Sequence, residues 1–201
     1  DKFADALAAL DGPVRVDEAS SPLAETRALE AGGVQIDYAP DPCILEKAQK
    51  TDAEIAGARE AHLRDGAAMC EFLAWFDRNA GPDLTEISVV KQLEACRRAT
   101  NALLDISFET IAGTGPNGAI MHYRVTEDTD RALADGDLLV LDSGAQYLDG
   151  TTDITRTLAI GTPGADERAA YTRVLQGMIA VSRLRWPQGL AGRGIEAIGR
   201  M

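Results

Sequence analysis

The chain has 201 residues, of which 45% are hydrophobic and 26% charged, and its formal net charge is −12 at pH 7. This composition allows one sizeable hydrophobic core and excludes wholesale disorder. Because no cluster of Lys and Arg is present, the negative charge argues against a nucleic-acid partner and favours cations or peptides with a free amino group.

The first forty residues alternate short helical and strand-like segments, a pattern typical of an α/β unit. The expected helices cover residues 2–10 and 22–31, and the expected strands cover 13–17 and 33–38. Pro40 and Pro42 then break the pattern. We therefore assign residues 1–42 to an α/β unit that is too short to be a stable domain alone, and residues 43–201 to a second domain.

Two helices open the second domain. Thr51 and Glu54 form a capping-box pair, which predicts the start of a long helix that ends near residue 79. Its apolar residues recur at i, i+3, i+4 and i+7 and so form one stripe, made of Met69, Phe72, Leu73 and Phe76. After Gly81 and Pro82, a second helix is expected over residues 85–98.

A run of strands follows these helices. Strands are expected over residues 105–112, 119–123, 136–147 and 150–160, and a helix after Pro163 and Gly164. Helices followed by a run of strands indicate an α+β fold, with the helices packed on one face of an antiparallel sheet.

The cysteines and the apolar runs indicate the cellular compartment of the protein. Cys43, Cys70 and Cys96 are odd in number and lack the spacing of a zinc motif. No apolar run approaches the length of a membrane-spanning helix, and the N-terminus shows no signal peptide. We therefore expect no membrane partner and a reducing cytoplasm.

Two carboxylates, Asp142 and Asp153, stand in consecutive expected strands. If they lie opposite each other, their Cβ atoms are about 4.5–5.5 Å apart, which suits a shared pair of cations. A tight turn centred on Asp149 and Gly150 would instead place Asp153 opposite Gln146. The metal interpretation therefore predicts a β-bulge near residues 149–152, and the alternative is two solvated strand residues.

His122 is the second candidate for chemistry. It ends the glycine-rich segment 113–123, which lacks the Lys-Ser/Thr pair of a phosphate loop. Asn117 and Gly118 predict a turn that leads into a short strand carrying His122. A lone histidine is more often structural than catalytic, so the residues by themselves leave its role open.

Three segments of the chain form a recognisable set. They are Ser107-Phe-Glu-Thr-Ile, Gly115-Pro-Asn-Gly-Ala-Ile-Met-His-Tyr, and the Asp142-Ser-Gly-Ala-Gln-Tyr and Gly-Thr-Thr-Asp-Ile-Thr-Arg-Thr157 pair. Together they resemble the Xaa-Pro aminopeptidases (aminopeptidase P) in their long, three-domain form. These enzymes belong to the pita-bread dinuclear metallopeptidases. The resemblance runs from about residue 45 onward and implies a curved antiparallel sheet covered by helices, preceded by the end of an α/β domain.

The resemblance also implies a mechanism. Asp142 would chelate one of two divalent ions and Asp153 would bridge both, with Mn²⁺ favoured and Zn²⁺ or Co²⁺ as alternatives. His122 would hydrogen-bond the substrate and stabilise the tetrahedral intermediate. Hydroxide bound to the metals would attack the carbonyl preceding proline. The implied partners are peptides with proline at the second position, and a homodimer is expected.

One His and two Glu would complete the ligand set, and we expect them beyond Met201. The chain is therefore expected to be a fragment that is inactive alone. The alternatives are a prolidase-like dipeptidase, a creatinase-like hydrolase without metal, a non-enzymatic pita-bread module that binds peptides or proteins, and an acidic α+β domain whose Asp pair is incidental. Retention of both Asp142 and Asp153 favours the metal-dependent enzyme.

Overall fold

The computed structural model describes residues 2–201, and the chain separates into two units between Ala53 and Glu54. The elements of the first unit are α1 (Lys2–Ala8), β1 (Val14–Val16), α2 (Leu23–Ala31), β2 (Ile36–Tyr38) and α3 (Cys43–Ala48). β1 and β2 pair in parallel, with α2 as the connection between them. This arrangement confirms the predicted α/β unit, whereas α3 was not predicted. The domain boundary at residue 42 stays a prediction.

The second unit begins within a long helix and contains a central antiparallel sheet. Its elements are α4 (Asp52–Asn79), α5 (Glu86–Arg98), β3 (Asp105–Ile106), β4 (Ile111–Thr114), the 3₁₀ helix η1 (Gly115–Ala119), β5 (Leu138–Ser143), β6 (Ala145–Gln146), β7 (Ile154–Ala159), α6 (Ala165–Ser182), the 3₁₀ helix η2 (Gly192–Gly194) and α7 (Glu196–Arg200). The sheet order is β4-β5-β7, and β3 pairs separately with β6.

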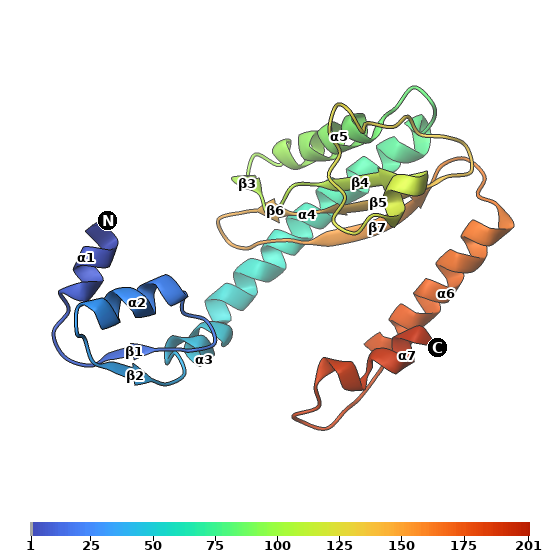
Figure 1. Cartoon of the computed structure of the whole chain (residues 1–201). Helices are drawn as coiled ribbons and strands as arrows, with labels where there is room; N and C mark the ends of the chain where they lie inside the picture. Colours follow the sequence, from blue (N-terminus) through green and yellow to red (C-terminus); the bar gives the residue numbers. More distant parts are fainter. Residues whose placement is uncertain (1) are drawn as a thin grey trace. The chain divides into compact units, whose positions relative to one another are not determined.

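Helices α4 and α5 lie along one face of this sheet (Figure 1). Side chains alternate along β5, so that Leu139, Leu141 and Ser143 are buried while the three between them are only half-buried. The apolar core joins Met69, Phe72 and Phe76 of α4, Val89 and Leu93 of α5, Ala112, Leu133, Leu139, Leu141 and Ile160. The predicted stripe on α4 and the α+β fold are both confirmed.

One predicted strand is divided in the structure, and another is wrong. Residues 105–112 form two strands, β3 and β4, which pair with different partners, β6 and β5. Residues 119–123 form no strand, because η1 and a following turn occupy this segment. Within this segment His122 adopts a positive φ angle of 57°, which is incompatible with an extended strand.

The core predicts a large difference between two positions on α4. Phe72 is fully buried, with its ring centroid 5.9 Å from those of Trp75 and Phe76. We expect Phe72→Ala to lower the free energy of unfolding by about 3–5 kcal/mol. Leu63→Ala, at a side chain that is 71% exposed, should change it by less than about 0.5 kcal/mol. Equal losses in chemical denaturation would show that this core does not hold the unit together.

Candidate metal centre

Asp142 lies near the end of β5, on the face of the sheet opposite α4 and α5. The register places it between Ile111 of β4 and Thr155 of β7. The Thr155 hydroxyl donates a hydrogen bond of 2.7 Å to Oδ1 of Asp142. The Thr155 bond therefore fixes one carboxylate oxygen of Asp142. Because the side chain is only half-buried, the carboxylate remains accessible to solvent.

Asp153 lies on the same face, but not directly opposite Asp142. One register runs from the pair Leu138 and Ala159 to the Gln146–Thr151 bridge, without an extra residue in either strand. The predicted bulge and the directly opposed carboxylates are therefore wrong. The bulge was predicted for a turn at residues 149 and 150, and with the turn one residue earlier the two carboxylates lie near each other without it. Asp153 lies two residues before Thr155, so alternation places it diagonally from Asp142, with Cα atoms about 7–8 Å apart.

The position of the turn explains this register. The Tyr147 N–H donates to the Gly150 carbonyl at 2.9 Å, so the two-residue loop is Leu148 and Asp149. The Asp149 carboxylate accepts two hydrogen bonds of 3.0 Å from the Arg64 guanidinium. A Cβ on Gly150 would lie 2.9 Å from the Cβ of Ala61, so this glycine permits close packing against α4. The turn is therefore set by contacts with α4.

A buried carboxylate lies beneath this hairpin. Asp65 of α4 is fully buried, and both of its oxygens accept hydrogen bonds. Arg97 donates to them at 2.8 and 3.1 Å, and the hydroxyls of Tyr147 and Thr152 donate at 2.8 Å each. We call these four residues the Asp65 network. It connects α4 and α5 with the residues on either side of the turn at Leu148 and Asp149, which joins β6 to β7 in a hairpin.

The network fixes the protonation of its members. Burial raises the pKa of Asp65, but the hydrogen bonds and charge of Arg97, with the hydroxyls of Thr152 and Tyr147, outweigh it and leave the pKa below its ordinary value. Burial, followed by the hydrogen bond to Asp65, raises the pKa of Tyr147 to about 12. At neutral pH the carboxylate is therefore ionised, and the tyrosine keeps the proton that it donates.

His122 lies on the exposed turn after η1, and within the described residues no hydrogen bond joins it to Asp142 or Asp153. The residue that follows it, Tyr123, is buried and donates to Glu86 at 2.9 Å. Glu86, the first residue of α5, also accepts from the Thr114 N–H at 2.7 Å and from the Asn117 amide at 3.1 Å. A second buried carboxylate therefore fixes the loop that carries His122.

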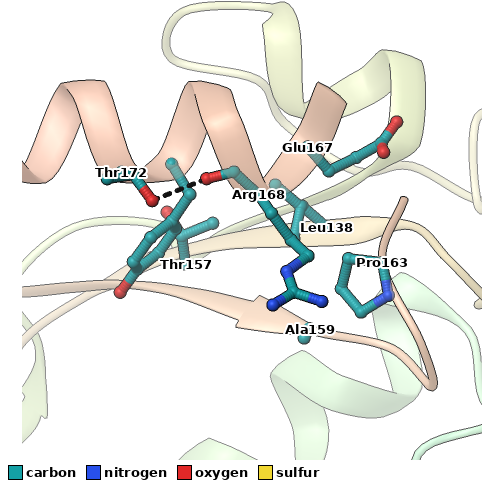
Figure 2. Close-up of a pocket in the computed structure, with 8 residues that line it drawn as sticks. Leu138, Thr157, Ala159, Pro163, Glu167, Arg168 and Thr172 are labelled. Carbon is teal, nitrogen blue, oxygen red and sulfur yellow. Dashed lines mark hydrogen bonds between the residues drawn. The ribbon is translucent and has the colours of Figure 1, made fainter. Parts of the chain in front are cut away.

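A pocket of about 370 Å³ lies along the face that bears Asp142, between the ends of two strands and α6. Figure 2 shows Arg168 and Thr172 of α6 above Thr157 and Ala159 of β7. None of the candidate residues lines it. Within residues 2–201, no group of three or more His, Cys, Asp or Glu side chains is placed to hold a metal ion.

Three residues of these buried contacts, Asp65, Glu86 and Thr152, were not predicted from the sequence. A signal was available for Asp65, because it lies four residues before Met69 and seven before Phe72, within the apolar stripe of α4. A charged residue in such a stripe indicates a buried pair. The partner cannot be identified in this way, since Thr152 lies 87 residues further along the chain.

Comparison with known proteins identifies relatives for most of the chain. The model of metallopeptidase family M24 matches residues 56–200. A Xaa-Pro aminopeptidase from Drosophila melanogaster is 41% identical over 160 residues, which make up 79% of this chain and 26% of that protein. The chain thus spans about a quarter of the length of this curated relative.

Solved structures show the same fold. An X-prolyl aminopeptidase from Caenorhabditis elegans, described as a cytosolic enzyme with a di-nuclear active site, superposes with a TM-score of 0.80 at 30% identity. The match covers 99% of this chain and 32% of that one. A Xaa-Pro dipeptidase from Bacillus anthracis gives 0.72 at 27% identity, over 94% of this chain and 51% of that one. These likenesses confirm the pita-bread fold.

The Asp65 network predicts a pH-dependent effect on stability. Asp65→Asn should lower the free energy of unfolding at pH 7 by about 3–5 kcal/mol, because it leaves Arg97 buried without its counter-charge. The pKa of Asp65 is lower in the folded protein than the ordinary 3.8, so its stabilisation is present above pH 3.8 and is lost as the pH falls through the folded value.

Urea denaturation between pH 7 and about pH 2 checks this expectation. The difference between wild type and Asp65→Asn should narrow below pH 3.8. Leu63→Ala, which removes no titratable group from an exposed position of α4, is the control, and its difference from wild type should stay constant over this pH range. A difference that stays constant across this range would contradict an ionised, paired Asp65.

Proposed function

The chain belongs to metallopeptidase family M24, and on this premise we propose that the full-length protein containing it is a metal-dependent aminopeptidase. It removes the N-terminal residue from peptides whose second residue is proline. The 41% identity to a Xaa-Pro aminopeptidase supports this substrate class. The single structural observation that carries the proposal is that Asp142 lies on the open face of β5, while the exposed Asp153 directly precedes β7 and falls on the same face by alternation.

The two carboxylates fit a site for divalent cations. Asp142 is half-buried and Asp153 exposed, so both present hard oxygen donors to solvent, and such donors suit Mn²⁺. We propose Asp142 as a chelating ligand, Asp153 as the bridging ligand, and Mn²⁺ as the metal, with Zn²⁺ or Co²⁺ as alternatives. Because the described residues hold no larger ligand group, the other ligands are proposed to lie outside them, and the 201 residues alone to be inactive.

When bound, two divalent cations would polarise the scissile carbonyl and supply a nucleophile at neutral pH. The residues of this chain would position the reactants. Thr155 holds one oxygen of Asp142, and the Glu86 contacts hold the turn that presents His122 to solvent. From this turn the His122 imidazole would donate a hydrogen bond to the substrate and stabilise the oxyanion that develops at the carbonyl.

A prolidase-like dipeptidase is the second candidate, supported by the likeness to the Bacillus anthracis Xaa-Pro dipeptidase. We propose a cytoplasmic location, since the Caenorhabditis elegans relative is described as cytosolic. Among the described residues no helix is long and apolar enough to cross a bilayer. A homodimer is also proposed, by analogy with the family.

The activity is tested with the full-length protein, Mn²⁺ and matched Ala-Pro-Ala, Ala-Ala-Ala and Ala-Pro peptides. We expect release of alanine from Ala-Pro-Ala only. Asp142→Asn and Asp153→Asn should each lower kcat/KM by more than about 100-fold, since each removes a proposed ligand. Asp166→Asn, on the exposed face of α6, is the acidic control and should retain activity.

The other outcomes are informative. Turnover of Ala-Pro alone would assign a dipeptidase, and no turnover of any peptide would support a binding module. Unchanged kcat/KM in Asp153→Asn would rule out its role as a bridging ligand.

A further inference from the structure

The geometry points to a positioning role for a residue beside the proposed metal ligand: we infer that Thr152, bonded to Asp65, sets the orientation of Asp153. This inference rests on the proposed function, because it takes Asp153 to be a ligand. The Asp153 side chain is exposed and makes no hydrogen bond with the described residues. Its direction must therefore come from the backbone on either side of it.

The backbone N–H, the backbone carbonyl and the side-chain hydroxyl of Thr152 are all hydrogen-bonded. Its N–H donates to the Ala145 carbonyl at 2.8 Å, and its carbonyl accepts from the Ser107 hydroxyl at 2.9 Å. Its own hydroxyl donates to Oδ2 of Asp65 at 2.8 Å and accepts from the Ala145 N–H at 3.0 Å. Since the residue is 1% exposed, water does not compete for these bonds.

The direction of Thr152 decides the direction of Asp153. Successive side chains of an extended segment point to opposite faces, so a threonine held toward α4 turns the next residue toward the open face. The segment that contains Thr152 packs closely against position 144, and only glycine fits there. A Cβ on Gly144 would lie 2.0 Å from Oγ of Ser107 and 2.1 Å from the Thr152 carbonyl oxygen. Any side chain at position 144 would displace the backbone that carries Asp153.

The charge of Asp65 gives the contact its strength. A hydrogen bond to an ionised acceptor is roughly twice as strong as a neutral one, and burial strengthens it further. Arg97 keeps this carboxylate ionised from the other side, through two hydrogen bonds that involve both carboxylate oxygens. Thr152 is therefore held by a charged group that cannot relax toward water.

The test measures metal affinity in the full-length protein, by calorimetric titration of the metal-free form with Mn²⁺. Thr152→Val keeps the shape of the side chain and removes the hydroxyl, and we expect it to weaken Mn²⁺ binding by about 10–100-fold. Thr152→Ser retains the hydroxyl and should bind within about threefold of wild type. If Thr152→Val does not fold, Thr152→Ala removes the same group and replaces it in the comparison.

Two further variants complete the experiment. One controls for a general loss of stability, and the other tests separately whether Asp153 is a metal ligand. Thr110→Val is the matched control, because Thr110 is also buried but its hydroxyl has no hydrogen-bond partner among the described residues. It should leave Mn²⁺ affinity unchanged. Asp153→Asn tests the ligand role itself and should weaken binding at least as much as Thr152→Val.

The results distinguish the ligand role of Asp153 from the positioning role of Thr152. If Asp153→Asn leaves the affinity intact, the proposed function fails at this residue. If Asp153→Asn weakens binding while Thr152→Val does not, the positioning role of Thr152 is wrong. Equal weakening in Thr152→Val and Thr152→Ser would assign the effect to packing and would also overturn the inference.

Discussion

The ionised carboxylate of Asp65, fully buried between α4 and the hairpin, constrains the rest of the second unit. A buried charge is costly unless it is paired and its remaining lone pairs are filled. Asp65 meets this requirement only when Arg97, Tyr147 and Thr152 all reach it, and these residues come from α5 and from both sides of the turn. An arrangement shifted by one residue would remove these donors, so the network selects one register.

A similar device supports the other candidate residue. Glu86 is fully buried at the start of α5, where Thr85 and Ser88 form a reciprocal capping box. It binds the two ends of the loop that carries His122, through Thr114 and Tyr123. In both cases a carboxylate on a helix fixes the residue next to an exposed candidate residue, Asp153 or His122. Candidate groups on loops are thereby held in place by the helices that pack against them.

The sequence predicted the parts of the structure that depend on local patterns. The apolar stripe around Phe72 and the long helix that carries it follow from a period of 3.6 residues, and the fold class follows from the order of helices and strands. The stripe and the fold class need no knowledge of distant contacts. The sequence also predicted Asp142 and Asp153 as metal ligands, a role that stays a prediction, but the direct opposition on which their shared face was argued is excluded by the register.

The errors arose where distant contacts decide the local structure. Asp149 and Gly150 have the composition of a tight turn, yet Arg64 binds the aspartate and α4 requires the glycine, so the turn lies one residue earlier. Residues 119–123 were expected to form a strand, but the Tyr123 N–H donates back to the Ile120 carbonyl in a turn, and the Tyr123 hydroxyl bonds to Glu86 of α5. The first contact comes from α4, 85 residues away from Asp149, and the second comes from α5, 37 residues away from Tyr123.

Anomalous diffraction from crystals of the full-length protein grown with Mn²⁺ tests most directly whether this hairpin builds a shared cation site. Two manganese peaks roughly 3.5–4 Å apart are expected, both in contact with Asp153 and one with Asp142, while Thr152 stays bonded to Asp65. Manganese bound away from this face, or an Asp153 side chain turned toward α4, would contradict the proposed centre.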